Sequence, residues 1–352
     1  MKGSRLGSAP GRVSARADVG EGDRRGVVST IVVVVVALIA WRVAGNGYAV
    51  NIAIIACMYA IVAASWDLTL GYGAMFDFSH AAMFGVGAYA CAIVTVDAGW
   101  SPWLGLVAGI LAGGTSGALV AGTVSRLRGI YVALASFAFA ELVDILVTSS
   151  SSITGGEQGM VLVPPLQIGS INLSGNASLF LYVMIGVLLV SIMVMRLLVS
   201  SSFGLGLRAM RDFEEYARSR GVPVGRHRMW VLVVSSAFAA MAGALFAGYT
   251  DVASPDLFGF STSTLLLTMV ILGGVGSVYG PAIGGVVMTV FVNIPQIAAL
   301  DTGSYLLTSA IILGVLLFVP GGLWSAVSGT YRAVGLRWRG PQPGAGRLGG
   351  KR

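Results

Sequence analysis

The chain has 352 residues, of which 56% are hydrophobic and only 11% are charged, with a net charge of +7. Soluble domains carry about 25% charged residues, and a soluble fold of this length needs more polar surface to cover its core. The composition therefore argues against a soluble enzyme, a disordered chain and a nucleic-acid-binding protein. The two cysteines, Cys57 and Cys91, both lie in apolar runs, so no disulfide framework is predicted.

Long apolar runs predict an all-α polytopic membrane bundle of about ten helices, some of them broken or re-entrant. About 18 apolar residues are needed to cross a hydrocarbon core about 30 Å thick, because a helix rises 1.5 Å per residue. The predicted spans are 27–44, 48–69, 79–96, 102–124, 129–149, 178–199, 229–250, 264–280, 281–300 and 303–320.

The chain begins with a basic segment, residues 1–26, that precedes the first apolar run. That run is as long as a membrane span, and no small-residue cleavage pattern follows it, so a signal peptide is disfavoured. We predict a disordered cytoplasmic tail over 1–26, a transmembrane domain over 27–324 and a second basic cytoplasmic tail over 325–352.

A glycine-rich segment separates the second and third predicted spans. It reads Leu-Gly-Tyr-Gly-Ala-Met-Phe-Asp-Phe-Ser-His at 70–80, and it places Asp77, Ser79 and His80 where the glycines interrupt the helix. Non-helical backbone at membrane depth is tolerated only where it is buried in protein or lines a water-filled cavity. The segment is therefore either a broken helix beside the substrate path or a short interfacial turn in which Ser79 caps the third span.

Glycines repeat every four residues in two regions of the chain. They are Gly105, Gly109, Gly113 and Gly117 in the fourth predicted span and Gly276, Gly280 and Gly284 around Pro281. Such spacing lets neighbouring helix backbones approach closely and favours structural packing over substrate binding. Around Pro281 the pattern is compatible with two spans or with one span and a re-entrant segment.

Two acidic residues, Glu141 and Asp144, lie on one face of the fifth predicted span. Ionisable residues inside a span are costly and face the bundle interior or a cavity. Glu141, the deeper residue, belongs either to the substrate path or to a structural interhelical hydrogen bond, and Asp144 lies near enough to the outer surface to be solvated.

The longest external loop follows this span and contains Thr-Gly-Gly-Glu-Gln-Gly. Its candidate residues are Thr154, Gly155, Gly156 and Gly159. The composition favours a flexible turn, with a gate or a docking surface for an external partner as the alternative.

The loop over 203–228 predicts a short amphipathic cytoplasmic helix that ends at Gly221. Apolar residues recur every three to four positions between charged ones, which suits a groove on a partner protein better than a membrane surface. The residues assigned to this helix are Arg208, Met210, Asp212, Phe213, Glu214, Ala217 and Gly221, with Leu207 in the same apolar stripe.

Basic residues predict the orientation. Of the 22, all except Arg42 fall in the two tails, between spans four and five, or around 203–228. With ten spans these clusters share one side, which the positive-inside rule assigns to the cytoplasm.

The motifs in the sequence do not support the chemistry of a soluble enzyme. The only lysines, Lys2 and Lys351, lie in the tails, so a Walker ATP-binding loop is missing from the sequence. His80 and His227 are far apart and lack a zinc-binding pattern. We therefore predict no ATPase site, no metal, no cofactor and no enzymatic activity.

Taken together, five stretches resemble the LivM family of membrane permease subunits from branched-chain amino acid ABC transporters. They are 70–90, 126–141 (Arg-Leu-Arg-Gly-Ile-Tyr to Ala-Phe-Ala-Glu), 154–159, 203–221 and 254–284 (from Ser-Pro-Asp-Leu-Phe to Leu-Gly-Gly-Val-Gly-Ser-Val-Tyr-Gly-Pro). The family usually has Gly-His where this chain has Ser79-His80, and small or apolar residues at Glu215, Tyr216 and Arg220.

The resemblance implies a permease of the cell membrane that moves branched-chain amino acids by alternating access. It also implies a second related permease subunit, two cytoplasmic ATP-binding subunits and an external substrate-binding protein as partners. Residues 208–222 then correspond to the coupling helix that seats in the ATPase.

Two other functions stay open at this point. One is a urea or short-amide ABC permease, which shares the same motifs. The other is a secondary transporter that uses Asp67, Asp77, Glu141 or Asp144 as a proton or sodium site.

Overall fold

The computed structural model describes residues 47–168, 171–172, 176–293 and 323–324. Seven segments of this part are long and apolar enough to cross a membrane, and a shorter apolar helix follows them, which confirms the all-α polytopic fold. Predicted spans two to seven are confirmed. Spans 27–44 and 303–320 and the two tails lie outside the described residues.

The first four spanning segments run from the start of the described chain to the external loop. The first comprises α2 (Gly47–Asp67) and the π-helical turn η1 (Leu68–Tyr72), and the second comprises α3 (His80–Ala92) and the π-helical turn η2 (Ile93–Asp97). The others are α4 (Pro102–Val124) and α5 (Ile130–Ser149), and the short helices α6 (Ser151–Thr154) and η3 (Gly156–Gln158) follow.

The second half of the chain contributes α7 (Ala177–Ser200), α8 (Ser202–Asp212), α9 (Glu214–Ser219) and α10 (Val224–Thr250). The turn η4 (Pro255–Leu257) leads into α11 (Phe260–Gly273), and α12 (Tyr279–Val292) follows. Four two-residue strands form two antiparallel pairs: β1 (Met160–Val161) with β4 (Val252–Ala253), and β2 (Gln167–Ile168) with β3 (Ile171–Asn172).

Helix α10 lies at the centre of the bundle and packs against α2, α3 and α4. The glycine face of α4 makes this packing possible, as its spacing predicts. A methyl group at Gly113 would overlap the side chain of Ala240, and one at Gly117 would lie 2.5 Å from Ser236 Oγ. Close helix contact through small residues is the usual means of packing helices in lipid.

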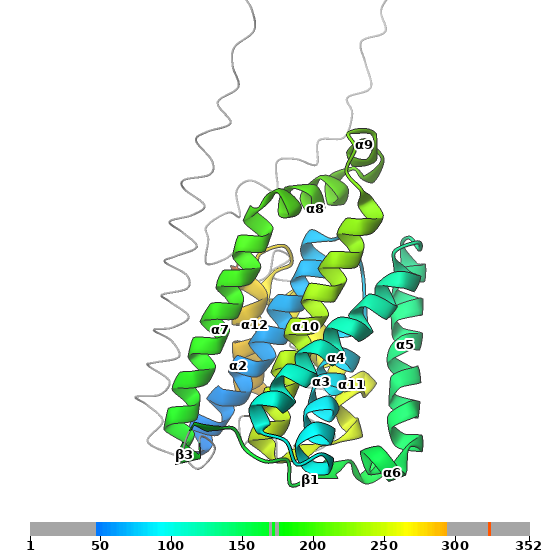
Figure 1. Ribbon diagram of the computed structural model, residues 1–352. Coiled ribbons are helices and arrows are strands. Elements are labelled where there is room, and N and C mark those ends of the chain that lie inside the picture. Colours follow the sequence, from blue (N-terminus) through cyan, green and yellow to red (C-terminus); the bar gives the residue numbers. More distant parts are fainter. Residues whose placement is uncertain (1–46, 169–170, 173–175, 294–322, 325–352) are drawn as a thin grey trace, which may run out of the picture.

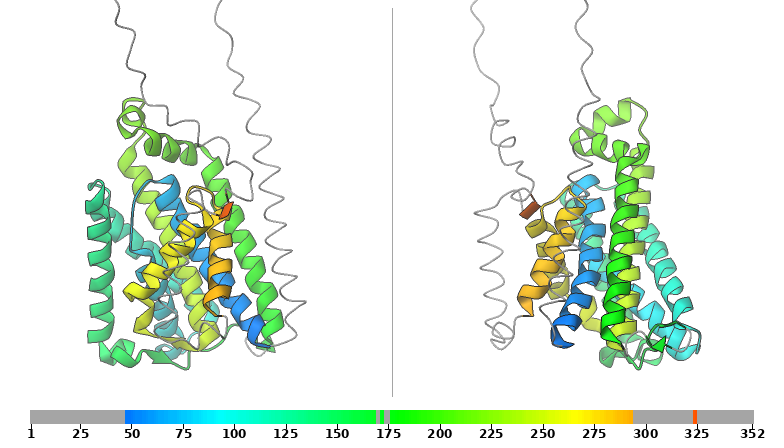
Figure 2. Two further views of the ribbon diagram at one scale, coloured as in Figure 1. Left: turned by 180° about the vertical axis from the view of Figure 1, so that it is seen from behind. Right: turned by 90° about the vertical axis from the view of Figure 1, so that its left-hand side faces the viewer.

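The glycines around Pro281 join α11 to α12. A methyl group at Gly284 would overlap the carbonyl oxygen of Met269, so the two helices touch along their backbones. Pro281 lies in the first turn of α12, where its missing N–H costs no helical hydrogen bond. The predicted boundary at 280/281 is therefore wrong, because the chain turns at 274–278. Figure 2 shows this helix pair beside α2.

The two ends of the bundle differ in charge. Helices α8 and α9 cover one end, and the turn at 125–129 lies at the same end, because Arg128 forms an ion pair with Glu214. We call this the basic end, since the described clusters of arginine lie there. The opposite end, which we call the acidic end, carries α6, η3 and the β1–β4 pair, with Glu157 and Asp251.

The segment at 73–79, which we call the break, is non-helical as predicted. It leaves η1 at the basic end and runs back along the bundle to the start of α3 (Figure 1). The segment is sheltered by protein, because five of its seven residues are buried or half-buried and Phe78 N–H is bonded to Ser136 of α5. These contacts are those of a helix break packed within the bundle, and a place beside the substrate path stays a prediction.

Candidate functional site

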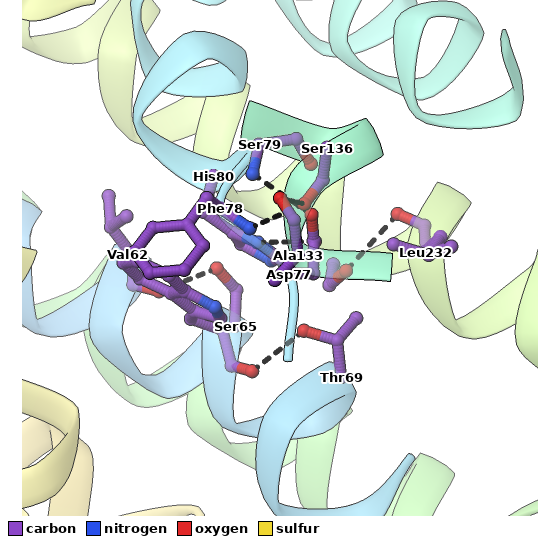
Figure 3. A network of polar contacts seen from close by, with 12 residues as sticks. Val62, Ser65, Thr69, Asp77, Phe78, Ser79, His80, Ala133, Ser136 and Leu232 are labelled. Atoms are coloured by element: carbon purple, nitrogen blue, oxygen red, sulfur yellow. Dashed lines mark hydrogen bonds and ion pairs between the residues drawn. The ribbon is translucent and has the colours of Figure 1, made fainter. Parts of the chain in front are cut away.

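The polar residues of the break face inward and hold it in place (Figure 3). Asp77 Oδ1 accepts a hydrogen bond from Ser79 N–H at 2.9 Å, and Asp77 Oδ2 lies 3.0 Å from His80 Nδ1. All three side chains are buried. His80 stacks on Trp66 with the ring centroids 5.2 Å apart, so the cluster joins the break to α2.

Ser79 occupies the position before α3, but its side chain makes no capping hydrogen bond. Asp77 accepts the backbone N–H of Ser79 itself, which fixes the residue that precedes the helix. The hydroxyl of Ser136 accepts the N–H of Phe78 at 2.9 Å, which attaches the break to α5 as well. Four backbone N–H groups of the break, those of Gly73, Met75, Phe78 and Ser79, thus have acceptors inside the protein, as burial requires.

An apolar groove of about 480 Å³ lies between the break, α5 and the start of α11. Its lining comprises Phe76, Phe78, Gly129, Ile130, Ala133, Leu134, Phe137 and Phe260. Phe78 contacts Phe76 and Phe137 edge to face, with ring centroids 5.2 and 6.3 Å apart. The break therefore presents its phenylalanines to the groove and its polar residues to the core.

Glu141 does not join the Asp77 cluster. It lies on α5 one turn beyond Phe137, on the helix face that carries the groove residues Leu134 and Phe137. The side chain is half-buried, and within the described residues it has no hydrogen bond or ion pair. Asp144, one further turn along, is half-buried too, and its Oδ1 is enclosed without a partner among the described residues.

The loop at 154–159, at the acidic end, is an ordered turn that packs against the start of the α10–α11 connection. Thr154 donates to the carbonyl oxygens of Val147 and Ser150, and Gly155, Gly156 and Gly159 have φ angles of +76°, +61° and +70°. A methyl group at Gly159 would overlap the carbonyl oxygen of Ala253. These glycines are thus required by backbone conformation.

The loop over 203–228 forms two helices where one was predicted. Helix α8 ends at Asp212, Phe213 is extended with φ −152° and ψ 95°, and α9 follows. The predicted end at Gly221 is confirmed by its φ of +85°. Arg208 bends back along its own helix and donates to the carbonyl of Val199 at 2.9 Å.

Three of the four apolar residues in the predicted stripe are covered by the chain itself and are not available to a partner, which the prediction did not anticipate. Leu207, Met210 and Ala217 are buried, the last two against Val224 at the start of α10. The stripe faces inward because α8 and α9 fold back over the end of the bundle. Phe213, at the junction of the two helices, is 75% exposed.

Glu214 is held by three arginines of its own chain. Its carboxylate lies 3.3 Å from Arg128 Nη2, 3.1 Å from Arg218 Nη2 and 2.9 Å from Arg228 Nη2. The charge therefore fixes α9 to the 125–129 turn and to α10. The exposed residues of the α8–α9 unit include Leu205, Asp212, Phe213 and Tyr216.

Sequence reasoning missed the groove residues Phe76, Phe78, Leu134 and Phe260. The apolar spacing of Ile130, Leu134 and Phe137 on one face of span five was a usable signal. Nothing in the sequence indicated that Phe260, far along the chain, would close the same groove.

Comparisons with known proteins give a consistent result. The family model described as branched-chain amino acid transport system / permease component matches residues 48–320. The LivM permease of the high-affinity branched-chain amino acid transport system of Escherichia coli K12 is 28% identical over 283 residues, which are 74% of this chain and 66% of that protein. LivM of Salmonella typhimurium is 27% identical over 282 residues, with the same coverage.

The high-affinity branched-chain amino acid transport system permease protein LivH of E. coli K12 is 25% identical over 283 residues, or 75% of this chain and 90% of LivH. The match to the two LivM proteins spans slightly less than two thirds of their length. No solved structure gives a significant match. With the family model covering most of the spanning helices, the chain is a multi-pass membrane protein and belongs to the permease component family of branched-chain amino acid transport systems.

Proposed function

We propose that this chain is the membrane-spanning permease subunit of an ATP-driven ABC importer that moves branched-chain amino acids by alternating access. The family match over residues 48–320 carries the proposal. ATP hydrolysis is assigned to separate subunits, since neither lysine of the chain stands in a Walker motif. A second related permease subunit and an external binding protein complete the system, and the basic end faces the cytoplasm.

The α8–α9 unit is proposed as the coupling element that seats in an ATP-binding subunit. It projects beyond the spanning helices at the basic end (Figure 1). It is attached to the spanning helices by buried apolar contacts with Val224 and by the ion pairs of Glu214 with Arg128 and Arg228, so a movement of the unit would be passed to the 125–129 turn and to α10. Phe213 and Tyr216, which are 75% and 59% exposed, supply the aromatic contact that anchors interfaces.

The groove is proposed as this chain's half of the substrate path. Its phenylalanines and aliphatic residues suit a branched apolar side chain. Glu141, one turn beyond Phe137 toward the acidic end, supplies a carboxylate for the α-ammonium group of the amino acid. Asp77, Ser79 and His80 act indirectly in this proposal, by holding the break that forms one wall.

Reconstitution tests the proposal. The full-length chain is coexpressed with the permease and ATP-binding proteins encoded beside it, and the complex is placed in proteoliposomes with the binding protein. We expect copurification of the ATP-binding subunits and leucine uptake that requires ATP. Uptake that follows an imposed proton or sodium gradient without ATP would instead identify a secondary transporter, and uptake of urea but not leucine would identify an amide permease.

A further inference from the structure

A three-way junction joins α8 to two spanning regions at the basic end. Arg211, in the last turn of α8, donates from Nη1 to the carbonyl oxygen of Gly71 in η1 at 2.9 Å. Asp67, at the end of α2, accepts the N–H of Gly276 at 2.7 Å through Oδ1. Gly276 lies in the turn between α11 and α12, so one arginine and one carboxylate connect three separate parts of the fold.

The junction is closely packed. A methyl group at Gly71 would overlap Asp67 Oδ1 and would lie 2.5 Å from the amide nitrogen of Gly276, and one at Gly276 would lie 3.0 Å from Arg211 Nη1. Gly276 also has a φ of +87°, which side-chain-bearing residues rarely adopt. The backbones of η1 and the turn therefore touch directly beneath the guanidinium group.

Arg211 and Asp67 carry opposite charges, and Arg211 also forms an exposed ion pair with Asp212 at 3.8 Å. Asp67 is fully buried, and its Oδ2 has no hydrogen-bond partner among the described residues. The guanidinium of Arg211 is held beside this carboxylate through Gly71, which contacts both side chains. Arg211 itself is only partly covered, with 45% of its side chain exposed and Asp212 nearby, so its contacts can change when α8 moves.

All three walls of the groove lead back to the α8–α9 unit. The break, with Phe76 and Phe78, continues directly from η1, and α11, with Phe260, ends at the turn that holds Gly276. The third wall, α5, begins at the 125–129 turn that Arg128 ties to Glu214 of α9. The Glu214 contacts hold α5, and the Arg211 junction holds the other two walls.

We propose that Arg211 is a positioning residue that transmits movement of α8 to the break and to α11, and so couples ATP hydrolysis to the opening of the groove. The inference rests on the proposed function above. Arg211 needs no contact with the ATP-binding subunit for this role, and Asp67 is its necessary partner because it fixes the turn at Gly276 to the same point.

The test measures leucine uptake and phosphate release in the same reconstituted proteoliposomes. For Arg211→Gln we expect normal copurification of the ATP-binding subunits, ATP hydrolysis within about twofold of wild type and about tenfold less leucine moved per ATP, the scale of one lost charged hydrogen bond. Asp67→Ala should give the same loss. The double variant should be no worse than either single one, because both break one connection.

Arg226→Gln is the matched control. It removes the same charge at the same end, from an exposed arginine that has no hydrogen bond or ion pair with any described residue, and it should behave as wild type. If Arg211→Gln moves as much leucine per ATP hydrolysed as wild type, the inference is overturned. If Arg211→Gln cannot be purified, the same result for Asp67→Ala overturns it. Loss of the ATP-binding subunits from Arg211→Gln also overturns it, since Arg211 would then be a docking residue.

The proposed function and the role of the Arg211 junction are overturned by different results. A wild-type complex without ATP-dependent uptake overturns the proposed function and the role of the junction with it. A wild-type complex that transports leucine, beside an Arg211→Gln variant that transports equally per ATP, overturns the junction alone.

Discussion

At the scale of single residues, Asp77 acts as the internal brace of the break. It serves both the Ser79 N–H and His80, and every one of these groups is buried. Buried groups that lose a partner keep the full cost of their desolvation. The chemistry of this carboxylate is therefore that of a structural acceptor, although a sequence-based assignment to the substrate path was reasonable for an acid at this depth.

We expect Asp77→Ala to lower the free energy of unfolding by about 1–3 kcal/mol, because it strands buried donors. Ser65→Ala is the control. Ser65 is equally buried beside the same cluster, but its hydroxyl only donates to the carbonyl of Val62 in its own helix (Figure 3), so its removal should cost about 0.5 kcal/mol or less. Denaturant titration in detergent gives both values. Equal losses would show that Asp77 has no bracing role.

Glu141 is the opposite case, an intramembrane acid without a partner among the described residues. If it receives the substrate ammonium, Glu141→Gln should raise the KM for leucine about tenfold and leave the assembly of the complex intact, since a charge-assisted hydrogen bond is about twice as strong as a neutral one. Asp97→Asn is the control, an exposed acid outside the groove. An unchanged KM for Glu141→Gln would remove this residue from the substrate path.

At the scale of elements, hydropathy alone located most of the helices. Spans two to seven were predictable because a lipid-facing helix must be apolar over its whole length. The break was predictable too, from glycines followed by polar residues. The partner of the amphipathic stripe was not, because periodicity reveals that Met210 and Ala217 are covered and does not reveal that Val224 of the same chain covers them.

The exposed part of the α8–α9 unit gives the element-scale test of docking. Charge reversal at Glu214 would break three ion pairs within the chain. A loss of the ATP-binding subunits from that variant could then come from misfolding as well as from a damaged docking surface. Phe213→Ala avoids this, because the ring is exposed, and truncation of an aromatic anchor should weaken retention of the ATP-binding subunits by about tenfold or more. Ile153→Ala removes an exposed apolar side chain at the acidic end and should retain them. Equal retention in both variants would place the docking surface elsewhere.

Packing of α4 on α10 offers a comparison between adjacent glycines. Gly113→Ala should destabilise the protein by about 1–3 kcal/mol, because its methyl group overlaps Ala240. At Gly114 the nearest atom is Ala237 Cβ at 4.0 Å, so Gly114→Ala should be neutral or slightly stabilising. Thermal unfolding in detergent separates the two. Similar melting temperatures would mean that the helices can shift apart without cost.

At the scale of the whole molecule, the distribution of charge and the arrangement of the groove support one another. The basic end carries the α8–α9 unit, and connections from that unit reach each wall of a groove in the spanning region. A force applied at the basic end would therefore act on the region where a substrate would pass. This arrangement suits an importer only if the basic end lies in the cytoplasm, where ATP is available.

Orientation can be measured directly because the only two native cysteines, Cys57 and Cys91, are buried and should react slowly. Ser219→Cys places a thiol on α9 at the basic end, and Ser152→Cys places one on α6 at the acidic end, both at exposed positions. In intact cells, a membrane-impermeant maleimide should label Ser152→Cys alone, and permeabilised cells should label both. Labelling of Ser219→Cys in intact cells would show that the molecule has the opposite orientation in the membrane. Helices α8 and α9 would then be out of reach of a cytoplasmic ATPase.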